Sequence, residues 1–306
     1  MPPTGQQARQ LLAPGDKRVL DANGVLTGFG KFTVHNDAQY AQANTGVIMG
    51  IYGKGGNGKT TLICSIADPK LNPDMHDLPM AVLDSEAGIK SVTHLLAPGY
   101  LDLIPIPSIS AVEDFIDLWG ASPKNQFPWR SILFDNLSDW VQKALKEQGF
   151  HGKDSVVSSQ PDYNAMTTRL TVILQNIRDL ATEYNVNCFF NLWEMTEKSD
   201  GGLIIGRRAD LTPKLAIRVM GILDYVGYLS VVNNPPHYTR KLDFSPNPEQ
   251  DTKTRRRPDE ASKDIPLELY SHDARSSLMV DLLNTIKRGV TFNRSNYIKR
   301  PSITGR

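Results

Sequence analysis

The stretch GVIMGIYGKGGNGKTT, residues 46–61, constrains the fold of this chain more than any other part of its sequence. A short, mostly apolar run leads into a loop of the form Gly-x-x-x-x-Gly-Lys-Thr, and the pattern that follows predicts a helix from about Lys59 to Ala67. The glycines permit backbone angles that side chains block, so amide N–H groups can turn inward around a phosphate at a helix N-terminus. The sequence therefore predicts a phosphate-binding loop between a buried strand and a helix.

This loop predicts binding of ATP with Mg²⁺. Lys59 is expected to reach the β- and γ-phosphates, and the Thr60 hydroxyl is expected to ligate the Mg²⁺ ion. Lys54 keeps two interpretations, a contact to a phosphate or a neighbouring subunit and a solvent-facing side chain. The predicted nucleotide-binding residues are Gly53, Lys54, Gly55, Gly56, Asn57, Gly58, Lys59, Thr60 and Thr61.

Beyond the loop, short apolar runs alternate with helical patterns. The clearest helix is expected over residues 163–184, where apolar side chains recur at helical spacing. Two further strands, at 222–232 and 237–244, are expected to be antiparallel. The order predicts an α/β fold whose mainly parallel sheet is flanked by helices, with antiparallel strands at the C-terminal side. The other expected strands are MAVLD (80–84), LDLIPI (101–106), SILFD (131–135) and VNCFFNLWE (186–194).

Two carboxylates follow predicted strands, where ligands bind in parallel sheets. Asp135 ends SILFD and is predicted to hold the Mg²⁺ shell, the alternative being an aspartate that caps the next helix. Asn136 follows it directly, so the Asp-Glu pair found at this point in many helicases and AAA+ proteins is missing. The residue that activates water must therefore come from elsewhere. Glu86, in VLDSEAG, is the predicted catalytic base, the alternative being an ordinary surface glutamate. Lys59, Glu86 and Asp135 form the predicted catalytic set.

The composition bounds the surroundings of this core. The net charge of +1 excludes a globally basic protein, but no acidic residue follows Asp281. The boundaries expected from composition are an N-terminal extension at 1–44, an ATPase core at 45–284 and a basic tail at 285–306. The tail suits either a solvated segment or a nucleic-acid arm, because aromatic residues are interleaved with its charges.

The sequence also predicts a compartment. Cys64 and Cys188 lie in apolar surroundings and are expected to be buried thiols in a reducing environment. The chain has neither the apolar run of a secretory signal at its start nor a run of about 18 apolar residues that would span a membrane. A soluble, cytoplasmic protein with no membrane partner is expected.

Together these residues resemble the RecA-like P-loop ATPases. In that group an Asp-x-Glu after the second strand supplies the catalytic glutamate and a lone aspartate ends the Walker B strand, as Asp84–Ser85–Glu86 and Asp135 do here. The order of motifs is most similar to the phage-encoded single-strand annealing ATPases of the fourth Sak class, which also show a counterpart of Asp162–Tyr163 before a long helix. The resemblance spans residues 46–232.

The resemblance implies further roles near the site. Glu194 matches the sensor that links the γ-phosphate to a mobile DNA-binding loop, although RecA itself has glutamine there. The following stretch TEKSDGGLIIGRRAD (196–210) would be that loop, with Arg207 and Arg208 on DNA phosphates, or else an ordinary surface loop. A basic run after the core strands would complete a neighbouring subunit's site, or else is simply solvated. Its candidates are Lys253, Arg255, Arg256 and Arg257.

Three functions are weighed on these grounds. The resemblance implies an ATP-driven recombination protein that assembles as a ring or filament on single-stranded DNA and promotes annealing or strand exchange. It further implies a single-strand-binding protein as a partner and a viral source, hence the host cytoplasm. The alternative is a MinD/ParA-like nucleotide-switched dimer in which Lys54 crosses to the other subunit. A loader or packaging ATPase is the third.

Overall fold

The computed structural model describes eleven segments of the chain, which divides into two units, Met1–Asn44 and Thr45–Arg306. The first unit contains an antiparallel sheet of β1 (Arg18–Leu20), β2 (Leu26–Phe29) and β3 (Phe32–Thr33), in which β2 pairs with both β1 and β3. The described residues are 18–20, 26–29, 32–33, 46–86, 88–96, 99–148, 160–234, 237–245, 249–253, 268–271 and 276–288.

The second unit is built on an eight-stranded sheet with the order β13-β12-β11-β4-β8-β7-β5-β6. From β11 to β6 every neighbouring pair is parallel, whereas β12 is antiparallel to both β11 and β13. This confirms the predicted mainly parallel α/β fold with antiparallel strands at the C-terminal side. One detail differs from the prediction that both C-terminal strands are antiparallel. Strand β11 pairs in parallel with β4, and it is antiparallel only to β12. The strands are β4 (Ile48–Tyr52), β5 (Met80–Asp84), β6 (Leu101–Pro105), β7 (Ser131–Asp135), β8 (Asn187–Leu192), β11 (Tyr225–Asn234), β12 (His237–Asp243) and β13 (Glu268–Ser271).

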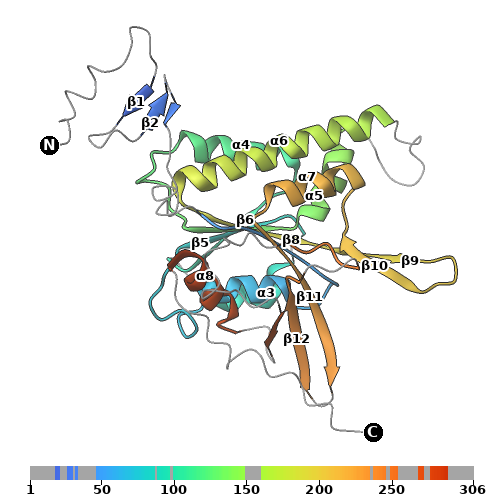
Figure 1. Cartoon of the computed structure of the whole chain (residues 1–306). Coiled ribbons are helices and arrows are strands. Elements are labelled where there is room, and N and C mark those ends of the chain that lie inside the picture. The colour runs from blue at the N-terminus through green and yellow to red at the C-terminus, as the bar shows by residue number, and fades with distance from the viewer. Residues whose placement is uncertain are drawn as a thin grey trace. The chain divides into compact units, whose positions relative to one another are not determined.

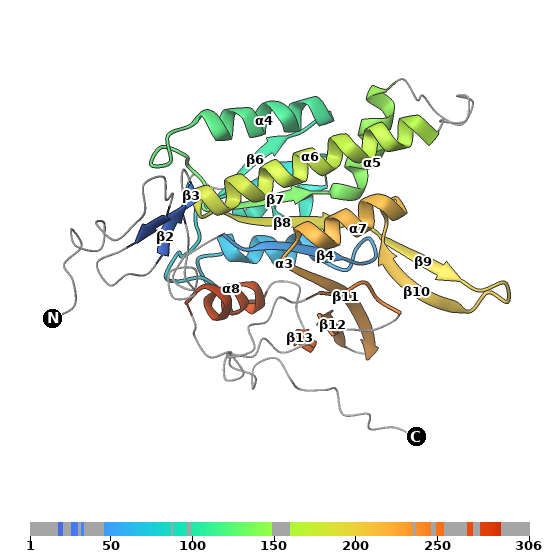
Figure 2. The ribbon, with the colours of Figure 1, turned by 45° about the horizontal axis from the view of Figure 1, so that its top comes forward.

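Helices cover both faces of this sheet (Figure 1). On one face lie α4 (Ile109–Ala121), α5 (Leu137–Glu147), α6 (Gln160–Tyr184) and α7 (Pro213–Ile222). On the other lie α3 (Lys59–Cys64), the 3₁₀ helices η1 (Ser65–Ala67) and η2 (Ile89–Leu95), and α8 (Leu278–Arg288). Figure 2 shows the same layers from a second direction, with the hairpin of β9 (Glu194–Lys198) and β10 (Ile204–Ala209) projecting beyond them.

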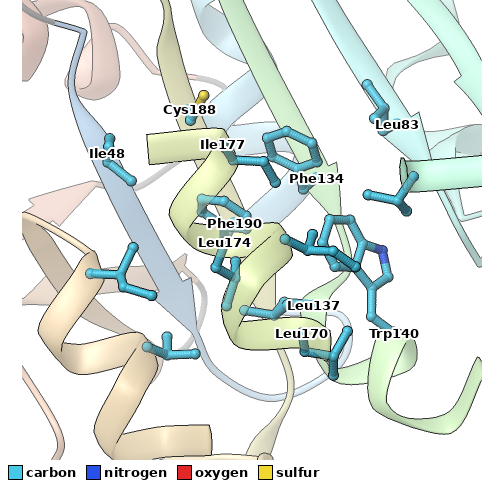
Figure 3. Packing of buried hydrophobic residues seen from close by; sticks show 14 of the residues in the cluster. Ile48, Leu83, Phe134, Leu137, Trp140, Leu170, Leu174, Ile177, Cys188 and Phe190 are labelled. Atoms are coloured by element: carbon cyan, nitrogen blue, oxygen red, sulfur yellow. The ribbon is translucent and has the colours of Figure 1, made fainter. Parts of the chain in front are cut away.

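The core divides into two clusters because successive side chains of a strand point to opposite faces. Ile132 and Phe134 of β7 pack under α4–α7, while Leu133 packs on the side of α3 and α8. Figure 3 shows the first cluster, in which Phe134 stacks on Phe190 with ring centroids 4.8 Å apart. The expected apolar face of α6 is confirmed, with five of its members buried and Leu180 partly buried: Met166, Leu170, Ile173, Leu174 and Ile177. Both cysteines are buried and unpaired, as expected.

Helix α8 is anchored by a buried ion-pair cluster at Asp77. Lys287 Nζ lies 3.0 Å from Asp77 Oδ1, and Arg288 Nη2 lies 2.8 Å from Oδ2. Asn187 donates to the same carboxylate at 3.0 Å. Burial acts to raise the pKa of Asp77, but these partners outweigh it and hold the pKa below its ordinary value. Lys287 and Arg288, which the sequence placed in a basic tail, thus belong to a packed helix.

Replacing Asp77 by asparagine is expected to lower the free energy of unfolding at pH 7 by about 3–5 kcal/mol, because it leaves a buried positive charge uncompensated. The depressed folded pKa means that the wild-type contribution is present above the unfolded value of about 3.9 and is lost as pH falls through the folded value. Urea unfolding at neutral and acid pH measures both effects.

The matched control for this prediction is Glu183→Gln, which breaks the exposed pair between Lys124 and Glu183. Its effect should not exceed about 1 kcal/mol, because solvent screens exposed ion pairs. Equal losses in Asp77→Asn and the control, or an unchanged acid dependence in Asp77→Asn, would contradict the anchoring role.

Among the described residues, none of the helices has both the length and the apolar character needed to cross a membrane.

Candidate active site

The phosphate loop joins β4 to α3 as the sequence predicted. Gly56 and Gly58 adopt φ values of 81° and 92°, in the left-handed region that favours glycine. Gly53 is required for a different reason, since a Cβ there would lie 2.3 Å from the Leu229 carbonyl oxygen. These positions explain why the loop is glycine-rich, and its last glycine, Gly58, is the N-cap of α3.

Lys59 lies across this loop and is 8% exposed. Its ammonium donates to the carbonyl oxygens of Gly53 at 2.7 Å and Lys54 at 3.1 Å. Burial lowers the pKa of Lys59, while the nearby carboxylates oppose that shift. The ammonium is therefore held at the loop, where the phosphate oxygens of a nucleotide would meet it. The side chain of Lys54 is exposed, and that of Thr61 lies 3.4 Å from Ser91 Oγ.

Thr60, Asp135 and Asn191 form the centre of the site. Thr60 Oγ1 donates to Asp135 Oδ2 at 2.8 Å, and Asn191 Nδ2 lies 3.0 Å from both Thr60 Oγ1 and Asp135 Oδ1. Burial raises the pKa of Asp135, while the hydrogen bonds from Asn191 and Thr60 oppose that rise. A hydroxyl and a carboxylate oxygen side by side are the donors that Mg²⁺ prefers, so the residues fit the predicted metal.

Asn191 was not identified from the sequence. It lies on β8, which separates the loop strand β4 from β7, and it is fully buried. Its Oδ1 has no hydrogen-bond partner within the described part of the chain. The available signal was an asparagine inside an apolar run, since a buried polar side chain normally has a specific partner.

The two interpretations of Asp135 can be separated in the structure. Helix α5 is capped by Asn136, whose Oδ1 accepts from Asp139 N at 2.9 Å. Asn136 follows Asp135 through a cis peptide bond, and its N–H donates to Ser85 Oγ at 3.0 Å. Asp135 therefore does not cap this helix and faces Thr60 instead.

Glu86 lies beside Asp135 across the ends of β5 and β7. Asp84 Oδ1 accepts the N–H groups of Glu86 at 3.1 Å and Gly88 at 3.3 Å, which fixes the turn after β5. The Glu86 carboxylate accepts a hydrogen bond from Asn136 Nδ2. Burial raises the pKa of Glu86 to about 7, and the charge of Asp135 adds to the shift. A carboxylate with this pKa is well matched to accept a proton near neutral pH.

The sequence of the chain matches a known protein family. Residues 45–256 match the profile of a family described as an AAA domain, AAA_24. The chain belongs to this family. A search of curated proteins finds no match. Among solved structures, the RadB recombinase matches with a TM-score of 0.44 and 15% identity, covering 76% of this chain and 90% of that one.

In this AAA domain Glu194 opens β9, whereas the sequence placed it at the end of the preceding strand, β8. Its side chain is 3% exposed, and Tyr228 donates to its Oε2 at 3.1 Å. Arg207 Nε lies 3.8 Å from Oε1. Burial and the Glu194 charge raise the pKa of Tyr228 to about 12. Arg207 thus places a basic group beside the buried Glu194 carboxylate.

The stretch predicted as a loose loop is instead an ordered hairpin of the AAA domain, β9–β10. Arg208 lies on this hairpin, and 47% of its side chain is exposed. Its Nη1 lies 3.3 Å from Glu197 Oε1, and its Nε lies 4.0 Å from Asp251 Oδ2. Backbone hydrogen bonds between the two antiparallel strands order this stretch. Its glycines and charges had suggested a loop instead. Exposed apolar side chains lie on and beside its strands: Met195, Leu203, Ile204 and Ile205.

Of the four basic residues predicted to act on a neighbouring subunit, only Lys253 lies among the described residues. Lys253 Nζ donates to the carbonyl oxygens of Met220 at 2.5 Å and Leu223 at 2.7 Å, at the C-terminal end of α7. A cation at a helix C-terminus stabilises that helix, so Lys253 is engaged within its own chain. The other three candidates, Arg255, Arg256 and Arg257, lie outside the described residues.

Proposed function

We propose that this protein binds and hydrolyses ATP with Mg²⁺. The observation that carries the proposal is the hydrogen bond between Thr60 and Asp135, which joins the phosphate loop to the strand next to Glu86. Thr60 and Asp135 would hold the Mg²⁺ ion, which shields the phosphate charges when bound. Lys59 would neutralise the β- and γ-phosphates.

Glu86 supplies the base in this proposal. It takes a proton from the attacking water, whose oxygen bonds to the γ-phosphorus while the bond to the β-phosphate oxygen breaks and leaves ADP. Asn136 orients the Glu86 carboxylate through its side-chain amide. Asn191 orients Asp135 and Thr60 through a single amide nitrogen.

We further propose that ATP hydrolysis serves DNA recombination, by assembly on single-stranded DNA and promotion of annealing or strand exchange. Two features support this role, the RecA-like arrangement of Asp84, Glu86 and Asp135 and the hairpin that starts at Glu194 beside the site. The phage-encoded annealing branch, a ring or filament of subunits, and a single-strand-binding partner belong to the same proposal. So does a trans-acting group among Arg255–Arg257.

A second candidate is the nucleotide-switched dimer of the MinD/ParA type. The observation that favours it is the exposed side chain of Lys54, which is accessible to a partner subunit. Electron microscopy with a non-hydrolysable ATP analogue, with and without single-stranded DNA, separates the candidates. Rings or filaments favour the recombination protein, and discrete dimers favour the switch.

Single-stranded DNA is expected to bind more weakly as salt rises, because phosphate contacts release counterions. Replacing Arg208 by alanine should weaken binding for all sequences and lower the slope of log affinity against log salt by about one. Fluorescence anisotropy at several salt concentrations measures the slope. Lys124→Ala, which removes an exposed charge paired with Glu183, is the control.

The DNA role fails if the wild-type protein retains no single-stranded DNA at low salt and its ATPase rate is unchanged by DNA. Equal slopes for Arg208→Ala and Lys124→Ala would remove Arg208 from the DNA contact while leaving the role itself standing.

A further inference from the structure

The phosphate loop is held from one side by the antiparallel pair β11–β12. Asn57 Nδ2 donates to the Leu229 carbonyl oxygen of β11 at 2.8 Å, and Gly53 packs against the same carbonyl. Tyr228 of β11 pairs in register with Tyr52, the last residue before the loop. The backbone of the loop is therefore built against strands that lie more than half the chain away in sequence.

Arg240, on β12, adds a charged contact that no motif in the sequence indicated. Its Nε donates to the main-chain carbonyl oxygen of Asn57 at 3.0 Å. A guanidinium carries a positive charge, so this hydrogen bond is charge-assisted. The contact is made to the backbone of the loop and not to one of its side chains.

The direction of that contact has a consequence for phosphate binding. In a trans peptide the C=O and N–H groups lie in one plane and point to opposite sides. Holding the Asn57 oxygen toward Arg240 therefore turns the Gly58 N–H away from β12. Gly58 is the N-cap of α3, and N–H groups at this place cradle the phosphates that ATP and ADP share.

We propose that Arg240 is a positioning residue for nucleotide binding, which orients the Asn57–Gly58 peptide so that the Gly58 N–H faces the phosphates common to ATP and ADP. The inference rests on the proposed ATP-binding function and assigns a specific part of it. Because the contact acts on the loop and not on the γ-phosphate, Arg240 contributes equally to the affinities for ATP and ADP and little to the hydrolysis step.

The adjacent residue Lys241 provides a matched control. It lies on the same strand, but its side chain points to the opposite face and forms an ion pair with Asp243 at 2.8 Å. Arg240→Gln and Lys241→Gln remove the same charge from neighbouring positions. Arg240→Lys keeps the charge and a donor but loses the guanidinium geometry.

The test is titration of the full-length variants with fluorescent ATP and ADP analogues, together with the steady-state ATPase rate. Arg240→Gln should raise the Kd for both nucleotides by about tenfold or more, as expected when one charge-assisted hydrogen bond is lost. Arg240→Lys should recover part of that loss. At saturating ATP, kcat should stay near the wild-type value, and Lys241→Gln should bind both nucleotides like wild type.

Three results would overturn the inference. They are equal affinities in the two glutamine variants, a loss confined to ATP, and a fall in kcat without a change in either Kd. Thermal unfolding without nucleotide checks that each variant folds. If Arg240→Gln does not fold, the nucleotide affinities of Arg240→Lys are compared with those of wild type instead. A wild-type protein that binds neither nucleotide would overturn the proposed function as well, whereas wild-type binding with an unaffected Arg240→Gln overturns this inference alone.

Discussion

Replacing Glu86 by glutamine is expected to lower kcat for ATP hydrolysis by about 10²–10⁴-fold, the range that a positioned general base contributes. Glutamine keeps the size of the side chain and an oxygen that can accept from Asn136, but it cannot take a proton from water. ATP affinity should change little, because Glu86 lies beyond the phosphate loop at the end of β5. Phosphate release measures the rate, and a fluorescent ATP analogue measures binding.

Two comparisons sharpen this prediction. Glu183→Gln makes the same chemical change at an exposed position and should leave both quantities unchanged. Lys54→Ala should retain much of the activity in a RecA-like enzyme, and it should abolish activity in a MinD/ParA-like dimer. If Glu86→Gln turns over ATP like wild type and Lys54→Ala is inactive, Glu86 is not the base and the MinD/ParA-like dimer is favoured.

Replacing Lys59 by methionine is expected to remove measurable ATP hydrolysis and to weaken ATP binding by at least about 10²-fold. Methionine keeps an apolar stem of similar length, but the ammonium that reaches the phosphates is lost. Charge-assisted hydrogen bonds contribute about 1.5–3 kcal/mol each, so the loss of two exceeds that factor. Because a ligand that binds only the folded state raises its stability, ATP with Mg²⁺ should raise the Tm of the wild type but not of Lys59→Met.

The control for this variant is Lys124→Met, an exposed lysine outside the site, which should keep the full rise in Tm. A Lys59→Met protein whose Tm still rises with ATP and Mg²⁺ as in the wild type would show that the loop does not bind nucleotide as proposed. Comparing Tm values without nucleotide separates this result from a simple loss of folding.

Local patterns predicted the fold well where an element carries its own signal. The loop was recognisable because the left-handed angles of Gly56 and Gly58 and the approach at Gly53 each demand glycine. Helix α6 was recognisable from its apolar spacing. The hairpin β9–β10 was missed because its charges, paired glycines and consecutive apolar residues do not alternate as in a half-buried strand.

The sequence by itself determined the phosphate loop, the strand that feeds it and the two carboxylates Glu86 and Asp135 at strand ends, because these depend on neighbouring residues. Only the tertiary structure decided which side chains surround them. Strand order in the main sheet places Asn191 between Thr60 and Asp135 and sets Arg240 against the loop. The pairing of β9 with β10 brings Arg207 to Glu194. Most of these pairs join residues far apart in the chain, whose meeting depends on the packing of whole elements and not on any local period.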